Sequence, residues 1–497
     1  MNKELTLDEI QNFEGKYPKQ LWMLFLTEMW ERFCFYGMRG VLTIFMADKI
    51  LGLSYSDKEA NLKYGAIQAF VYAFTFIGGI CADKILGFKK SLFFGGIIMI
   101  VGNLIIAASP KEFFYIGITL SIIGTGFFKP NISSMVGDLY KEGDPRRDAG
   151  FGLFYSGINI GALLGGALCV YLGKYHSWSY AFLAAAIVMI IGVVTFTITK
   201  KYLGPIGNSP LLHIEDSKRK MREIFVYIGA LVCIPLILIM IQNTSYTDYF
   251  MYTVGPVALI YFLYEVVKTK NINAQKKLIA ALVFILFSII FWAFFEQSGG
   301  SLSLFAEKNL RFNLAGLQID PNVINNTSNS FFVIIFSPLI GLLWLWLAKK
   351  KLEPNTVIKF GIAFLFLAAS FYVFYYNKFF VDADGKASLN VFTFAYLVIT
   401  IAELCLSPIG LSIMTKLSPK HLSGMMMGMW FLASAYGQYA AGLLGAGMST
   451  PDKDASLMTK LTSYTDGYLQ LAEYALIAGV ALIVLSVGIK KLMQEVK

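Results

Sequence analysis

Segments of about 20 apolar residues recur along the whole sequence, and each is long enough to cross a bilayer as a helix. We expect about fourteen such spans: 21–47, 62–82, 91–108, 113–135, 151–172, 179–198, 224–242, 252–267, 278–297, 329–348, 357–376, 391–414, 424–447 and 468–489. The chain is 56% hydrophobic and only 15% charged, whereas roughly a quarter of the residues of a soluble protein are charged. A β-barrel would instead alternate in ten-residue segments. The sequence therefore predicts an all-α polytopic membrane protein.

The distribution of positive charge predicts how the chain is oriented in the membrane. With the N-terminus inside and fourteen spans, the inside segments hold roughly two-thirds of the 42 lysines and arginines. This excess obeys the positive-inside rule and predicts that both termini are cytoplasmic. The net charge of +10 is then a topology signal rather than a nucleic-acid-binding surface.

Two basic links divide the spans into groups of six, two and six. The predicted segments are a cytoplasmic tail (1–20), a six-helix bundle (21–198), a basic linker (199–223), two additional helices (224–267), a second linker (268–277), a second six-helix bundle (278–489) and a tail (490–497). Two six-helix halves with a site at the membrane midplane are a common plan of secondary transporters. An irregular bundle without pseudo-symmetry is the alternative. The sequence has no nucleotide-binding glycine loop followed by lysine, which argues against ATP-driven pumping.

The first span carries four ionisable side chains within an otherwise apolar run. At 100° per residue they fall at about 0°, 300°, 40° and 20° around the helix axis, on one face: Glu28, Glu31, Arg32 and Arg39. Tyr36 flanks that face, and we expect Trp30, Phe33 and Met38 to face outward. A charge at the bilayer centre costs at least roughly 2.5–3.5 kcal/mol, so such residues normally face a protein interior or a watery cavity. The charged face therefore predicts a polar cavity.

A few polar residues in other spans complete a candidate site. Lys129, Glu296 and Glu403 are embedded, and Asn159 and Asn329 add amides. Each alone could be a structural ion pair or hydrogen bond. Together, positive charge in one half and negative charge in the other suit a zwitterion.

Two further features indicate what such a cavity would do. The rings of Tyr36, Tyr72 and Tyr155 could line it, giving hydrogen bonds without side-chain selectivity. Glu28 and Glu31, beside Arg32, could carry a driving proton, because burial and a neighbouring arginine change proton affinity in opposite directions.

Several motifs resemble one transporter family. The segment EMWERFCFYGMRG (28–40) resembles the E-x-x-E-R-F-x-Y-Y-G signature of the proton-dependent oligopeptide transporter (POT) family of the major facilitator superfamily. GFGLFYSGINIGALLGG (150–166) is similar to that family's second signature. FFKPNISSMVGDLY (127–140), AELCLSPIGLSIMTKLSP (402–419) and GMMMGMWFLASA (424–435) resemble its fourth, tenth and eleventh helices. The resemblance covers about residues 20 to 490, and the two extra spans are similar to those of bacterial members.

The resemblance implies a function and a role for each matching position. It implies a major facilitator fold and a proton-coupled importer of dipeptides and tripeptides, working without a cofactor and as a monomer in a bacterial inner membrane. Proton coupling would fall to Glu28, Glu31, Arg32 and Lys129. Arg39 and Lys129 would meet the peptide carboxylate, and Asn159, Asn329 and Glu403 the amino end. The remaining binding positions would be Tyr36, Tyr72, Tyr155, Glu296, Gln297, Ser407 and Trp430.

Departures from the family pattern keep alternatives open. Phe35 replaces the first tyrosine of the usual pair, and Ser330 follows Asn329 where the family usually has proline. The runner-up function is a related carrier of another small anion or zwitterion, such as nitrate or a modified amino acid. A membrane sensor would need a soluble output domain, and an enzyme would need a nucleophile–base pair. The sequence shows neither, and it leaves preferred peptides and proton stoichiometry open.

Overall fold

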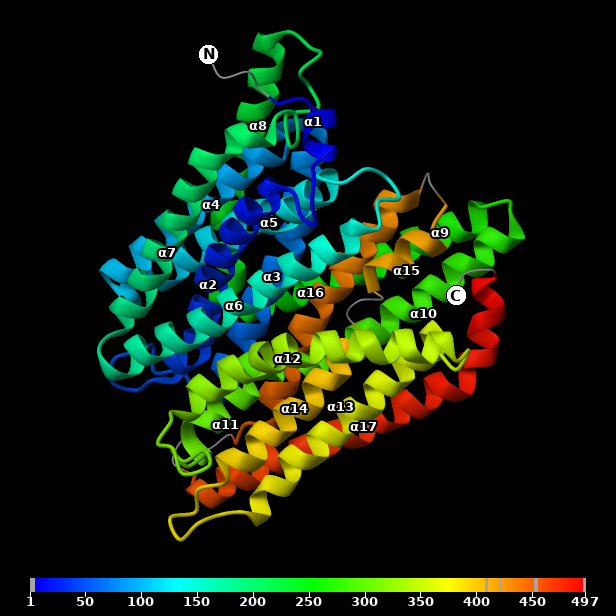
Figure 1. Ribbon diagram of the computed structural model, residues 1–497. Helices are drawn as coiled ribbons and strands as arrows, with labels where there is room; N and C mark the ends of the chain where they lie inside the picture. Colours follow the sequence, from blue (N-terminus) through cyan, green and yellow to red (C-terminus); the bar gives the residue numbers. More distant parts are fainter. Residues whose placement is uncertain (1–4, 407–409, 420–421, 451–454, 495–497) are drawn as a thin grey trace. The chain divides into compact units, whose positions relative to one another are not determined.

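The computed structural model describes residues 5–406, 410–419, 422–450 and 455–494, and this part of the chain is almost entirely helical (Figure 1). Within it, fourteen helices have 18 residues or more: α2 (Lys19–Ala47), α3 (Asp57–Cys81), α4 (Phe88–Ala108), α5 (Pro110–Asp138), α6 (Arg146–Tyr175), α7 (Trp178–Thr199), α8 (Asp216–Gln242), α9 (Thr244–Lys268), α10 (Ile272–Phe295), α12 (Pro321–Lys349), α13 (Thr356–Tyr376), α14 (Leu389–Leu406), α16 (Ser423–Met448) and α17 (Leu457–Met493). The predicted all-α polytopic fold is confirmed.

Twelve helical stretches of the described residues are long and apolar enough to cross a membrane. The two long helices outside this set are α2 and α16. Every 18-residue window of α2 contains at least three charged residues, which explains its exclusion. In α16, many glycines and alanines together with tyrosines and a glutamine lower the hydropathy. Composition alone therefore understates the number of long buried helices in this chain.

In the part of the chain that the structure describes, seven short helical elements lie between or before the long helices. They are α1 (Leu7–Gln11), η1 (Ala82–Leu86), η2 (Lys200–Leu203), η3 (Glu296–Gly299), α11 (Ser301–Asn309), η4 (Asn377–Phe379) and α15 (Gly410–Leu417). The predicted span 391–414 is shared by α14 and α15, and their junction, which includes Ser407, lies outside the described residues. The predicted span 278–297 ends in η3, where the α-helix stops and α11 begins after Gly300.

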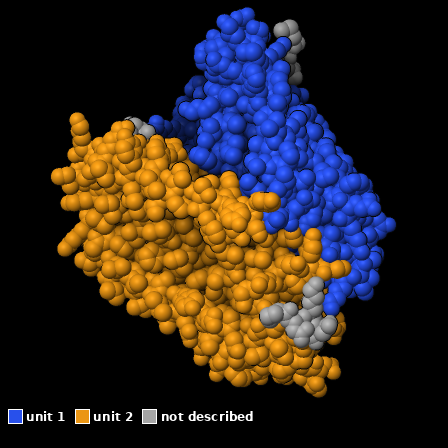
Figure 2. Space-filling model, turned by 180° about the vertical axis from the view of Figure 1, so that it is seen from behind, with its two compact units in different colours: residues 1–53, 70–243 blue, residues 54–69, 244–497 orange. Residues whose placement is uncertain are grey.

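The helices form two compact units, coloured separately in Figure 2. Unit 1 comprises residues 1–53 and 70–243, and unit 2 comprises residues 54–69 and 244–497. Helix α3 belongs to both, because its first 13 residues (57–69) pack within unit 2 and the rest within unit 1. The two additional helices are also divided, with α8 in unit 1 and α9 in unit 2.

In unit 1, helix α2 is enclosed by its neighbours α5, α6 and α7. Phe33 and Met38 are only 4% and 2% exposed, so the expectation that they face outward is wrong; Trp30 is partly buried. The physical reason is a close approach of α6. A Cβ added at Gly165 would lie 2.3 Å from the Phe33 carbonyl oxygen, so only glycine permits this packing.

Gly161 makes the same kind of approach beside the charged residues of α2. A Cβ there would lie 2.2 Å from the Met29 oxygen and 3.0 Å from Arg32 Cβ. We expect Gly161→Ala to displace α2 and to lower both transport and thermal stability. Overpacking of this kind lowers the free energy of unfolding by about 1–3 kcal/mol. Gly152→Ala, on the same helix with nothing within 4 Å, is the matched control. Equal melting temperatures and uptake for the two variants would show that α6 does not set the position of Arg32.

In unit 2, the first half of α3 is held by a polar network. Asp57 forms an ion pair with Lys308 of α11, and the Tyr464 hydroxyl donates to Asp57 Oδ2 over 3.1 Å. One helical turn further on, Asn61 donates to Ser449 Oγ over 3.2 Å. These bonds join the beginning of α3 to α11, α16 and α17.

Candidate functional site

The charged face of α2 forms one compact cluster inside unit 1. Glu28, Glu31 and Arg32 are each at most 2% exposed. Arg32 Nε lies 2.9 Å from Glu28 Oε1 and 2.5 Å from Glu31 Oε2. Helical spacing places Glu31 and Arg32 on the face of Glu28, because residues three and four apart lie on the same face. The sequence prediction that these three side chains lie together is confirmed.

The cluster leaves part of its hydrogen-bonding capacity unused. Glu28 Oε2, Glu31 Oε1 and Arg32 Nη2 are buried without a hydrogen-bond partner among the described residues. With both carboxyl groups ionised, the three side chains carry one net negative charge. Uncompensated charge buried in this way is costly, so the cluster gains from a proton, a water molecule or another cation.

Lys129 of α5 supplies a second positive charge near the cluster. Its charge acts on both Glu28 and Glu31, and its ammonium lies 4.1 Å from the ring centroid of Tyr72. Pro130 follows it inside the helix and removes one backbone N–H donor, which loosens the helical hydrogen bonding at this point.

Phe35 lies between the two cations of this site. Its ring centroid is 5.6 Å from the Arg32 guanidinium carbon and 5.8 Å from the Lys129 nitrogen. Sequence reasoning did not include Phe35 among the site residues. Phe35 follows Glu28 by seven residues, which places it on the charged helix face. This spacing could have identified Phe35 as a site residue from the sequence.

The other predicted residues of unit 1 have partners of their own. Arg39 stands over the ring of Tyr36, 5.7 Å from its centroid. The Asn159 amide donates to the Tyr155 carbonyl oxygen over 3.0 Å, within the same helix. Asn159 is 6% exposed and Tyr155 is partly buried. Their predicted contacts with a substrate stay predictions.

In unit 2, Glu403 of α14 is positioned by a neighbouring helix. The Asn329 amide of α12 donates to Glu403 Oε2 over 2.8 Å and to Thr400 Oγ1 over 3.2 Å. Glu403 is 9% exposed, and the charge of Glu296 acts on it. Sequence reasoning missed Thr400, although its place three residues before Glu403 puts both on one face.

The break between α10 and α11 places Glu296 and Gln297 inside the bundle of unit 2. The Gln297 amide donates to the carbonyl oxygens of Ala293 and Ala441, both over 3.0 Å, and its oxygen accepts from Ser301 over 2.6 Å. Gln297 therefore ties α10, η3 and α16 together. Glu296 is 4% exposed. Interrupted helices of this kind often supply ion or substrate sites in transporters.

Two further predicted residues of unit 2 differ in what the structure says of them. Trp430 of α16 is 6% exposed, and a Cβ at Gly410 would meet its ring at 2.3 Å. Ser407 lies outside the described residues.

Sequence reasoning missed one hydrogen-bond network of unit 2. The Tyr396 hydroxyl donates to Asn325 Oδ1 over 2.6 Å, and the Asn325 amide donates to the Ser298 oxygen over 2.9 Å.

The fold and the buried charges define a class of protein before any comparison is made. Long apolar helices enclosing a carboxylate–arginine cluster in one unit and a carboxylate–amide pair in the other are features of a polytopic secondary transporter.

Comparison with known proteins gives the family. The sequence model of the POT family matches residues 89–462, and the chain belongs to this family. The chain is 34% identical over 435 residues to the uncharacterized transporter YclF of Bacillus subtilis (85% of this chain, 86% of that protein). It is also 34% identical over 459 residues to the peptide transporter YePEPT of Yersinia enterocolitica (88% and 89%).

A solved structure shows the fold over the full length. The crystal structure of a peptide transporter POT in complex with sulfate matches with a TM-score of 0.83 at 30% identity, covering 99% of this chain and 100% of that one. The predicted major facilitator fold is therefore confirmed. The family is one of membrane transporters, and the chain is a multi-pass transporter rather than an enzyme.

Proposed function

We propose that this protein is a proton-coupled symporter that imports dipeptides and tripeptides by alternating access. The observation that carries the proposal is the buried cluster of Glu28, Glu31 and Arg32, which holds two carboxylates against one guanidinium. Membership of a family with a named peptide transporter at 34% identity supports the substrate class.

The charge balance of the cluster supports proton coupling. One proton on either carboxyl group makes the three side chains electrically neutral, and its loss restores one net negative charge that Lys129 must balance. A buried site whose net charge changes by one favours different surroundings in its two states. We propose that this difference links proton binding to the conformational step, with Lys129 joining the coupling residues.

We propose that charged side chains recognise the two ends of a peptide. Arg39 and Lys129 would bind the carboxylate, and Glu403 with its partner Asn329 would bind the ammonium. Recognition of backbone ends leaves the peptide side chains without fixed charged contacts. We therefore propose that many sequences of two or three residues are accepted. Binding would also involve Asn159, Glu296, Gln297, Ser407 and Trp430, and the rings of Tyr36, Tyr72 and Tyr155.

The arrangement in the membrane belongs to the same proposal. We propose that the chain lies in a bacterial inner membrane with both termini cytoplasmic, works as a monomer, and divides into bundles at 21–198 and 278–489 with additional helices at 224–267. The excess of lysine and arginine in the predicted inside segments supports this orientation.

Uptake into proteoliposomes tests the proposal. We expect labelled dialanine to accumulate when the outside is acid, and a proton ionophore at fixed membrane potential to abolish the accumulation. A labelled free amino acid and labelled nitrate are the control substrates, and neither should accumulate. Accumulation of dialanine that does not respond to the ionophore would contradict proton coupling, and accumulation of nitrate instead would identify a different substrate class.

A further inference from the structure

Unit 1 contains a basic cavity of about 760 Å³, and none of the residues that line it belongs to α2. It is formed by the start of α4, the turn η2 that follows α7, residues 207–212 of the linker, and α8. Two contacts one helical turn apart join α8 to α4 beside this cavity. Lys90 Nζ lies 2.6 Å from Glu223 Oε1, and the rings of Phe94 and Tyr227 are 4.7 Å apart.

The linker wall of the cavity is built by specific hydrogen bonds. Lys89 Nζ donates to the Gly204 oxygen over 2.6 Å and to Asn208 Oδ1 over 3.0 Å, and Lys89 N–H donates to the Gly207 oxygen over 2.9 Å. Ser209 Oγ donates to the Ile85 oxygen over 2.5 Å. The linker is thus a fixed part of unit 1 rather than a loose connection.

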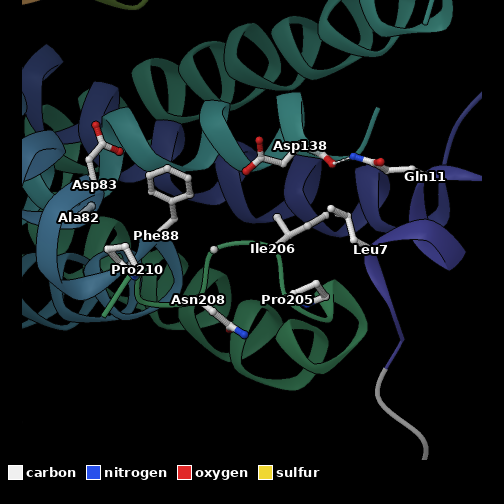
Figure 3. A pocket seen from close by; sticks show the side chains of 12 residues that line it. Leu7, Gln11, Ala82, Asp83, Phe88, Asp138, Pro205, Ile206, Asn208 and Pro210 are labelled. Atoms are coloured by element: carbon white, nitrogen blue, oxygen red, sulfur yellow. Dashed lines mark hydrogen bonds between the residues drawn. The ribbon is translucent and has the colours of Figure 1, made fainter. Parts of the chain in front are cut away.

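The other face of the same linker borders a second cavity, of about 410 Å³, which Figure 3 shows between α1, the end of α5 and residues 205–210. That cavity has acidic side chains, Asp83 and Asp138, and the Gln11 amide donates to the Asp138 carbonyl oxygen over 3.0 Å. Gly207 and Asn208 line both cavities. The linker therefore separates an acidic cavity from a basic one.

The basic cavity carries an excess of positive charge. Five cationic side chains line it: Lys89, Lys90, Lys200, Lys201 and Arg219. Two carboxylates compensate part of this charge, since Lys90 pairs with Glu223 and Arg219 lies 2.8 Å from Asp216. Lys200 and Lys201 are exposed and form no ion pair with any described residue. The cavity therefore suits an anion.

The wall next to these cations is apolar and aromatic. Phe93 and Ile97, one and two turns further along α4, are 39% and 38% exposed, and Lys200 Nζ lies 5.3 Å from the Phe93 ring centroid. On α8, the ring of Tyr227 lines the same cavity. Both helices continue from this basic end into apolar spans. A free anion would gain nothing from these rings, whereas acyl chains would bury them.

We propose that this cavity binds an anionic phospholipid, with the phosphate at Lys200 and Lys201 and an acyl chain along Phe93, Ile97 and α8. Basic pockets between transmembrane helices at the cytoplasmic surface are suited to such head groups. The site gives α8 a role: its Glu223 and Tyr227 contacts complete the cavity. The lipid would bridge α4, α7 and α8, and it is independent of the proposed substrate.

Native mass spectrometry of the delipidated, detergent-purified protein tests the site with phosphatidylglycerol as the probe. We expect Lys200→Gln/Lys201→Gln to bind phosphatidylglycerol about 10- to 30-fold more weakly than the unaltered protein. Each of the two lysines near the membrane surface should contribute about equally to the affinity for an anionic lipid. Lys200→Arg/Lys201→Arg should keep the affinity, because it keeps the charge. Both side chains are exposed, so the melting temperature without lipid should not change.

The matched control is Lys349→Gln/Lys350→Gln, a basic pair at the end of α12, which should bind phosphatidylglycerol like the unaltered protein. Phosphatidylcholine, which has the same acyl chains and no net charge, should bind weakly to all variants. The same affinity in both glutamine pairs would overturn the site. Phosphatidylcholine binding as tightly would overturn anion recognition, and displacement by equimolar inorganic phosphate would show that the occupant is a free anion.

Discussion

Glu31→Gln is expected to abolish concentrative peptide uptake while leaving exchange of labelled for unlabelled peptide largely intact. Exchange needs only that the loaded carrier reorients, whereas concentrative uptake needs the empty carrier to reset with its proton released. A glutamine cannot release a proton. In the structure, the change leaves Glu28 and Arg32 as a neutral pair, 2.9 Å apart, which has the charge of the protonated cluster. The variant should therefore behave as a carrier held in its protonated state.

Folding should survive this substitution. Glutamine is nearly isosteric, its oxygen can accept a hydrogen bond from Arg32, and the uncompensated buried charge of the cluster is removed. We expect an unchanged or raised melting temperature. Glu112→Gln, at the exposed start of α5, is the control for removing a carboxylate from unit 1 and should pump normally.

The decisive data are counterflow, gradient-driven uptake and melting temperature on the same purified variant. If Glu31 only braces the bundle, the buried Arg32 loses a partner and all three properties should fall together. Wild-type accumulation by Glu31→Gln would show that the proton is carried elsewhere, and Glu28→Gln would then be the next variant to measure.

The helices could be predicted from the sequence because each depends on a local run of apolar residues. Fourteen long helices lie near the expected spans, and most extend beyond them. Helix α8, for example, begins at Asp216 rather than at 224, because a membrane helix continues through polar residues once it leaves the hydrocarbon. The break at Glu296 was not predicted, since hydropathy does not distinguish a continuous helix from one interrupted by a short 3-10 turn.

The site could be predicted only where its residues share one helix. Glu31 and Arg32 follow Glu28 by three and four residues, so both lie on its helix face and their meeting follows from helical geometry. The pairing of Asn329 with Glu403 joins residues 74 positions apart, and that of Asp57 with Lys308 residues 251 positions apart. Such contacts depend on the packing of whole helices, which no local pattern contains. The basic cavity beside α8 was missed because it too depends on how whole helices pack. In the sequence, its lysines are indistinguishable from a topology signal.

Glu403→Gln is expected to weaken the binding of peptides with a free amino group far more than that of amino-blocked peptides. Only the free peptide offers an ammonium to the carboxylate, and losing one member of a partly buried charge pair costs about 3 kcal/mol, or roughly 100-fold in affinity. The Asn329 amide, 2.8 Å from Glu403 Oε2, can donate equally well to a glutamine oxygen, so the contact between α12 and α14 should persist.

Competition against a labelled dipeptide by dialanine and by N-acetyl-dialanine distinguishes a role of Glu403 in peptide binding from a purely structural role. Glu473→Gln, on the exposed side of α17, removes the same charge elsewhere in unit 2 and should leave both affinities unchanged. Parallel losses for the blocked and free peptides would remove Glu403 from the amino-end role. A selective loss for the free peptide would assign the amino end to unit 2, because a merely structural carboxylate has no means of distinguishing an ammonium from an acetamide.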